Sequence, residues 1–204
     1  MARCGTSQRR RRKLDTQADE RRDTRPGRET WIEAGFLELA DGGIDRVKVE
    51  VLARRINVTK GGFYWHFRDR ADLLTSMLTR WSEGRTTAIA RQTEAAGGDA
   101  RARLRGLIRL YVENANPRGM AIEMAVRDWA RRDQRAASAV AMVDTARLER
   151  VCGLFRDLGL NEEVASARAF LFYSFIFGQA LLLPPGGEEA RRRLTDACTG
   201  LLVD

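Results

Sequence analysis

The chain has 204 residues, of which 44% are hydrophobic and 31% are charged, and it carries a formal net charge of +8. A chain of this length and composition can bury a sizeable core, which excludes wholesale intrinsic disorder. No apolar run is long enough for a membrane span or for the core of a signal peptide, so we expect a cytoplasmic protein with no membrane partner.

Positive charge is concentrated near the start of the chain. Residues 1–28 contain ten Lys and Arg against four Asp and Glu, and residues 46–70 contain seven against two. Residues 29–45, between them, contain five acidic residues and no basic one. This distribution is typical of a protein that binds a polyanion, and the alternative is a solvated charged face with a basic tail.

The first predicted segment, residues 1–24, is an Arg-rich arm that lacks the apolar residues of a core and is expected to be disordered. Its run Arg9–Lys13 suits contacts with a DNA minor groove and phosphates, and it suits a solubilising role equally well.

Helices are predicted after the arm, because Ala, Leu, Arg and Glu abound, prolines are few, and alternating β-branched residues are scarce. The first helix begins at Pro26 and ends at Gly42–Gly43. The second covers residues 48–56 and the third residues 59–67, with Asn57 at the turn between them.

The fourth predicted helix begins after Asp69, a candidate N-cap. Glycines, prolines and an Asp then divide the remaining chain into five more helices. We expect these near residues 99–114, 119–132, 134–158, 162–183 and 187–202, which gives an all-α fold of about nine helices.

The second and third helices form a compact pair within Val47–Leu74. Each of the two adjacent glycines in the third helix costs about 1 kcal/mol relative to Ala, which indicates that another surface approaches closely. A basic, aromatic and hydroxyl-bearing helix of this kind suits a DNA major groove, and an ordinary three-helix domain with surface charges is the alternative. The residues concerned are Thr59, Lys60, Gly61, Gly62, Tyr64, Trp65 and His66.

The segment from Pro26 to Leu74 resembles the N-terminal DNA-binding domain of TetR-family transcriptional regulators. The resemblance implies that Lys60, Gly61, Tyr64 and His66 face the major groove, and that Lys48, Thr59 and Arg70 contact phosphates. The matching residues are Leu52-Ala53, Val58-Thr59-Lys60-Gly61, Phe63-Tyr64-Trp65-His66-Phe67, Arg70 and Leu73-Leu74.

The chain departs from the family pattern at three positions. Asn57 replaces the usual turn glycine, which is tolerable because Asn accepts a left-handed backbone. Lys48 stands where a Thr or Ser cap is common, and Glu50 stands where some members carry a basic contact residue. Glu50 is suited either to accept a hydrogen bond from cytosine N4 or to point to solvent.

Residues for catalysis or metal binding are not grouped in the sequence. His66 is the only histidine, and Cys4, Cys152 and Cys198 lack metal-ligand spacing. We therefore expect no enzyme activity, no cofactor and no metal site. An all-α enzyme and an architectural DNA binder without an effector are the alternative functions.

The segment Ala169–Phe177 is apolar almost all the way round a helix, which predicts burial on several sides. The simplest account is a helix that packs on its own domain and on a second copy, although an interior helix of a monomer is also possible. With an apolar stripe on residues 187–202, the predicted homodimer interface consists of Phe170, Tyr173, Phe177, Leu181, Leu194 and Leu201.

Aromatic and methionine side chains in the C-terminal half could line a cavity for a small, at least partly apolar effector, or could be ordinary core. Glu123, Arg127 and Asp128 could supply polar anchors or form a salt-bridged surface. The predicted ligand-binding residues are Met77, Trp81, Tyr111, Met124, Trp129, Phe155 and Tyr173.

Together these patterns predict a homodimeric, ligand-responsive repressor that binds double-stranded DNA at a palindromic operator. The expected divisions are a basic arm over residues 1–24, a helix-turn-helix DNA-binding domain over residues 25–70, and a ligand-binding and dimerisation domain over residues 71–204.

Overall fold

The computed structural model describes residues 26–95, 97–113, 116–182 and 187–204, and within these ranges it contains helices and connecting loops but no strand. This confirms the predicted all-α fold class. The arm over residues 1–24, which includes Cys4 and Arg9–Lys13, lies outside the described residues. Among the helices of the described ranges, none is long and apolar enough to cross a membrane.

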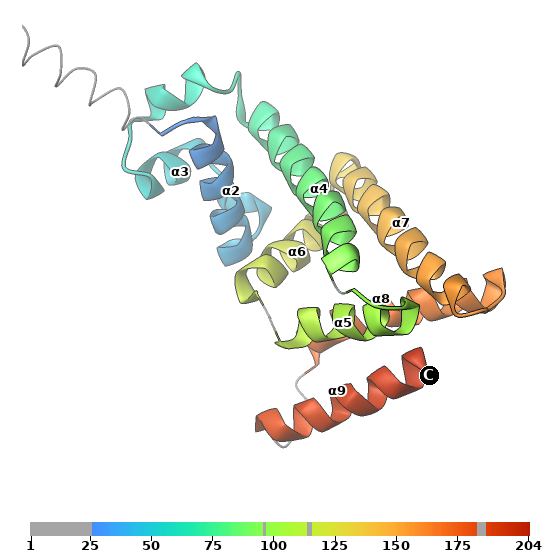
Figure 1. The fold of residues 1–204 in the computed structure, drawn as a ribbon. Coiled ribbons are helices and arrows are strands. Elements are labelled where there is room, and N and C mark those ends of the chain that lie inside the picture. Colours follow the sequence, from blue (N-terminus) through green and yellow to red (C-terminus); the bar gives the residue numbers. More distant parts are fainter. Residues whose placement is uncertain (1–25, 96, 114–115, 183–186) are drawn as a thin grey trace, which may run out of the picture.

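Eight α-helices and two 3-10 helices follow one another in the described part of the chain (Figure 1). They are α2 (Arg28–Gly42), η1 (Ile44–Arg46), α3 (Val49–Arg55), η2 (Lys60–Trp65), α4 (Arg70–Ala95), α5 (Ala100–Glu113), α6 (Pro117–Ala130), α7 (Gln134–Asp157), α8 (Glu162–Leu181) and α9 (Gly187–Val203).

Local residue chemistry accounts for where these helices begin and end. Gly43, with a φ of 80°, ends α2 and donates its N–H to the Leu39 carbonyl at 2.8 Å. The side chains of Asn116, Asp133 and Asn161 accept backbone N–H groups at the starts of α6, α7 and α8. The predicted breaks at these positions therefore have ordinary capping chemistry.

The third predicted helix differs from expectation in its type. Residues 60–65 form the 3-10 helix η2 rather than an α-helix. The segment is short and includes Gly61 and Gly62, whose weak helix propensity gives an α-helix little local support.

Two apolar clusters form the core. The first joins α2, α3 and η2 to α4, α6 and the first half of α7, so it continues across the boundary predicted between residues 70 and 71. The second joins α5, the end of α7, α8 and α9.

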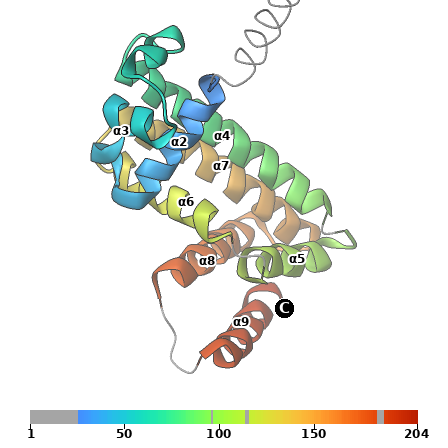
Figure 2. The ribbon, with the colours of Figure 1, turned by 90° about the vertical axis from the view of Figure 1, so that its left-hand side faces the viewer.

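The helix pair and α9 lie at opposite ends of the molecule, as both ribbon views show (Figure 2). The 26-residue helix α4 leads from the helix pair toward the second cluster. Helix α6 packs on α2 and α7, which gives the N-terminal region a second connection to the rest of the protein.

Candidate functional site

The α3–η2 pair is held on the body of the protein by aromatic packing. Phe63, on the inner face of η2, is fully buried, and its ring centroid lies 5.3 Å from that of Trp31 and 5.2 Å from that of Phe67. Asn57, with a φ of 55°, makes the turn between the two elements. Because Phe63 fixes the inner face, the opposite face of η2 is turned outward.

The outer face carries most of the residues predicted to bind DNA. Lys48, Thr59, Lys60, Gly61 and Tyr64 are exposed, whereas His66 is half-buried. The sequence therefore brings these residues to one end of the molecule, and their contacts with DNA stay a prediction.

Trp65 is an exposed residue that the sequence prediction did not include in the contact set. Its side chain is 87% exposed, and it lies beside Thr59, Gly61 and His66 along one concave surface. Its position between Tyr64 and His66, close to the two glycines, was the signal that the sequence offered.

The two glycines of η2 are not required by the fold itself. Neither has a positive φ, and an added Cβ would lie 3.8 Å from Thr59 Oγ1 at Gly61 and 3.9 Å from Trp31 at Gly62. These are ordinary van der Waals distances. Packing within the protein therefore leaves room for a side chain, and a close approach from outside gives a reason for its absence.

Lys60 is paired with Glu50 across the α3–η2 pair. Its Nζ donates a hydrogen bond to Glu50 Oε1 at 2.5 Å, and both side chains are more than half exposed. This hydrogen bond lowers the pKa of Glu50 and raises the pKa of Lys60. Glu50 thus contacts Lys60 as well as solvent. It pairs with the ammonium group that was expected to contact bases.

Arg70 contacts the backbone of its own domain. Its Nε donates to the Val47 carbonyl at 2.6 Å, and its Nη2 donates to the Ile44 carbonyl at 2.8 Å. These bonds tie the start of α4 to the residues before α3. These contacts support a structural role for Arg70, and the phosphate contact that the resemblance implied stays a prediction.

Other basic residues near the pair also form ion pairs within the protein. Arg55 and Arg46 donate to the buried carboxylate of Glu38 at 2.5 and 2.8 Å. Burial raises the pKa of Glu38, but these hydrogen bonds outweigh it and lower the pKa overall. The positive charge of residues 46–70 is thus divided between bracing the domain and facing outward.

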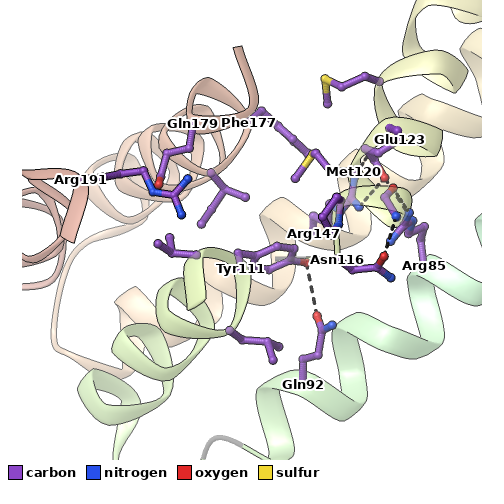
Figure 3. Close-up of a pocket in the computed structure, with 17 residues that line it drawn as sticks. Arg85, Gln92, Tyr111, Asn116, Met120, Glu123, Arg147, Phe177, Gln179 and Arg191 are labelled. Carbon is purple, nitrogen blue, oxygen red and sulfur yellow. Dashed lines mark hydrogen bonds and ion pairs between the residues drawn. The ribbon is translucent and has the colours of Figure 1, made fainter. Parts of the chain in front are cut away.

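A cavity of about 480 Å³ lies where α4, α5, α6, α7, α8 and α9 meet (Figure 3). Its size is in the range of small-molecule sites in proteins. Both polar and apolar side chains form the wall, including Arg85 and Gln92 from α4, Tyr111 from α5, Glu123 and Met124 from α6, Arg147 from α7, Phe177 and Gln179 from α8, and Arg191 from α9.

The seven predicted ligand-binding residues divide between this wall and the two cores. Tyr111 and Met124 line the cavity. The other five fill the cores instead, because large apolar groups gain most from complete burial. Met77, Trp81 and Trp129 belong to the first cluster, and Phe155 and Tyr173 belong to the second.

A buried ion network forms one side of the cavity, and sequence reasoning had named only part of it. Glu123 accepts hydrogen bonds from Arg147 at 2.7 and 3.1 Å and from Arg127 at 3.0 Å, and it pairs with Arg85 at 3.2 Å. Arg127 also makes two bonds to Asp144, at 2.6 and 2.9 Å. The network joins α4, α6 and α7 through three arginines and two carboxylates.

The protonation states in this network follow from its geometry. Burial raises the pKa of Glu123, but the three arginines outweigh it and lower the pKa overall. Burial lowers the pKa of Arg85, although Glu123 opposes this. Asp128, another expected anchor, lies on the surface and pairs with Arg132.

The predicted interface residues also divide in two. Phe170, Leu181, Leu194 and Leu201 are exposed, with Phe170 64% and Leu201 83% accessible. Tyr173 and Phe177 turn inward instead, and Phe177 lies under the Arg127 guanidinium at 4.2 Å. Helices α8 and α9 therefore present large apolar side chains to solvent in the single chain.

No group of three or more potential metal ligands occurs among the described residues. Cys152 is buried and bonds weakly to Ser166 and Glu162, and Cys198 is half-buried.

Comparisons with known proteins agree on the motif and the fold. Residues 32–77 match the family model described as bacterial regulatory proteins, tetR family. A solved transcriptional regulator from Rhodococcus sp. Rha1 is 20% identical with a TM-score of 0.68, over 87% of this chain and 96% of that chain. The reduced form of E. coli NemR is 15% identical with a TM-score of 0.66, over 86% and 94% of the two chains.

A TetR-family transcriptional regulator from Bordetella parapertussis 12822 is 19% identical with a TM-score of 0.61, over 87% of this chain and 94% of that chain. A search of the curated proteins finds no significant match. The likeness therefore rests on the helix-turn-helix motif and on the arrangement of helices across most of the chain.

Proposed function

We propose that the chain, which matches the tetR family model over residues 32–77 and is similar in fold to TetR-family transcriptional regulators, is a ligand-responsive repressor that binds a specific operator as a homodimer. The predicted division into an arm, a DNA-binding domain and a ligand-binding and dimerisation domain is part of this proposal. The proposed place of action is the cytoplasm, where the operator DNA of a bacterium lies.

The observation that carries the proposal is the outer face of η2. Lys60, Tyr64 and Trp65 are exposed on it, and its two glycines have room for side chains that they lack. We assign the reading of bases to Lys60, Gly61, Tyr64 and His66, and phosphate contacts to Lys48, Thr59 and Arg70. Arg70 also holds this surface in place through its bonds to Ile44 and Val47.

The proposed homodimer is formed by α8 and α9. Phe170 and Leu181 on α8 and Leu194 and Leu201 on α9 are large apolar side chains left in solvent. Pairing these helices with their copies on a two-fold axis would remove them from water. The same axis would direct two η2 elements toward two half-sites of a palindrome.

The proposed effector site is the cavity lined by Tyr111 and Met124. Helix α4 begins at the helix pair and supplies Arg85 and Gln92 to the cavity wall. Helix α6 supplies Glu123 to the same wall and packs on α2. A ligand that prefers another spacing of α4 and α6 would thus bias the position of the helix-turn-helix domain.

Selection of bound fragments from a library of random duplexes tests this proposal. The expected result is one enriched palindromic sequence, bound by two chains per duplex in light scattering and released by at least one member of a small-molecule library. Enrichment of no sequence would favour an architectural DNA binder instead. A detectable turnover of small molecules in place of release would favour an enzyme.

A further inference from the structure

Two residues of the cavity wall carry buried side-chain nitrogens that lack a hydrogen-bond acceptor. Among the described residues, four buried side-chain nitrogens have no hydrogen-bond partner, and two of these, Arg147 Nε and Gln179 Nε2, belong to residues of this one wall. Arg147 is nine-tenths buried or more, with only 3% of its side chain accessible. An unpaired buried donor is costly, so the Gln179 amide favours a bound group that can accept a hydrogen bond.

The cavity wall carries net positive charge, which also favours a hydrogen-bond acceptor. Arg85, Arg147 and Arg191 line the cavity with a single carboxylate, that of Glu123. Behind the wall, Arg127 and Asp144 cancel one another. Glu123 cannot neutralise three guanidinium groups, so the cavity keeps an excess of positive charge.

Among the three arginines of the described cavity wall, Arg191 is the one without a carboxylate partner. Within the described part of the chain it makes no ion pair or hydrogen bond, whereas Arg192 and Arg193 pair with Glu188 and Glu189 one turn earlier in α9. In Figure 3, Arg191 and Gln179 are both drawn toward the α8–α9 end of the cavity, and Tyr111 lies toward the Arg85–Glu123–Arg147 group.

The remaining wall is suited to an apolar body. Leu110, Val112, Met120, Met124, Ile176 and Phe177 contribute carbon and sulfur surface. The methionines adapt to varied shapes because their side chains are unbranched and flexible. The wall thus combines an apolar surface with donors and positive charge.

From these observations we propose that the cavity binds an organic acid, a monocarboxylate with an apolar body, whose carboxylate lies between Arg191 and Gln179. The guanidinium and the amide N–H would each donate to a carboxylate oxygen, and the body would lie on Tyr111 and Phe177. This inference rests on the proposed function, because it names the chemical class of that function's effector.

Matched ligands test the charge directly. Titration calorimetry on the full chain would compare 4-phenylbutyrate, 8-phenyloctanoate and decanoate with the primary amide and the amine of each. Because charge-assisted hydrogen bonds are stronger than neutral ones, we expect the best acid to bind roughly tenfold or more tightly than its amide, and the amines not to bind. An equal or better affinity for amides or amines, or no binding by any compound, would overturn the proposal.

Variants of α9 test the position of the carboxylate. Arg191→Gln should lower the affinity for the best acid roughly tenfold and change the affinity for its amide by less than about twofold. Arg193→Gln removes the same charge from the same helix outside the cavity wall, and it should leave both affinities unchanged. Equal losses in the two variants, or no loss in Arg191→Gln, would contradict the assignment. Gln179→Met should also lower the affinity for the acid, and it does so without changing the net charge.

The operator complex separates this inference from the proposed function. Release of DNA by an amide or an amine, with no effect of the acids, would retain the effector function and refute the acid. Tight binding of an acid that leaves DNA affinity unchanged would retain the acid site and refute the effector function.

Discussion

Two glutamate–cation pairs lie in the two regions that we propose for DNA binding and effector binding, and their surroundings differ. Glu50 and Lys60 meet on the exposed face of the helix pair, where both side chains are more than half accessible. Glu123 and Arg147 meet between α6 and α7, where each side chain is 3% accessible. A carboxylate–cation pair is therefore solvated at one end of the protein and almost inaccessible to water at the other.

The difference indicates what each pair can do. Water and salt screen an exposed pair, so a phosphate or a base can replace one partner at little cost. A buried pair cannot lose a partner without leaving an uncompensated charge in a medium of low dielectric constant. The exposed pair is thus suited to exchange partners, and the buried pair is suited to hold α6 and α7 together.

The largest expected effect is the loss of the buried carboxylate. Glu123→Gln keeps the shape of the side chain but leaves Arg85, Arg127 and Arg147 with too little negative charge. We expect a loss of about 3–5 kcal/mol in the free energy of unfolding, measured with urea.

Asp128→Asn is the matched control for this change. It alters a carboxylate of the same helix that pairs with Arg132 on the surface. Its unfolding curve should lie close to that of the natural chain, because exposed ion pairs contribute little. If the two variants lost equal stability, the contrast between buried and exposed pairs would be wrong.

The second-largest expected effect is a loss of stability at acidic pH, through the buried network. The folded pKa of Glu123 lies below its ordinary value of 4.5, so the unfolded chain binds protons more readily. The contribution of this group is therefore complete above about pH 4.5 and is lost as the pH falls through the folded pKa. Asp133, the N-cap of α7 with a pKa of about 2, adds to the loss at lower pH.

Urea midpoints between pH 7 and pH 3 measure this dependence. The natural chain should become less stable below about pH 4.5, whereas the curve of Glu123→Gln should be flatter over the same range. Parallel curves would show that Glu123 is not the group that titrates.

The order of helices could be predicted from the sequence because local residues determine it. Gly43, Asn57, Asp133 and Asn161 end or cap helices through bonds to backbone groups a few positions away. The 3-10 form of residues 60–65 was missed, because a short segment with two glycines has no strong local preference.

The cavity wall could be predicted only in part. Aromatic and methionine side chains suggest a pocket, yet Met77, Trp81 and Trp129 pack in the core. Arg85 and Arg147 are instead held in the wall by Glu123, which lies on a different helix from each. Such a network depends on which helices pack against each other. Neither the periodicity nor the composition of the sequence predicts that packing.

Changing the DNA-facing cation should affect DNA binding and leave folding intact. Lys60→Ala removes an exposed ammonium that we assign to base reading. We expect an approximately tenfold or greater loss of affinity for the selected operator, a smaller loss for unrelated DNA, and a weaker dependence on salt. Fluorescence anisotropy at several salt concentrations measures all three. Arg132→Ala, which removes a surface charge from the turn after α6, is the control and should change none of them.

The smallest expected effect comes from the other half of the exposed pair. Glu50→Gln frees Lys60 and removes a negative charge that faces the phosphates, so affinity for unrelated DNA should rise about threefold. The urea midpoint should not move, because water already solvates both side chains. A fall in affinity confined to operators with cytosine at one position would instead show that Glu50 accepts a hydrogen bond from that base. In that case the exposed pair would separate on DNA with both partners engaged, which the buried Glu123–Arg147 pair cannot do.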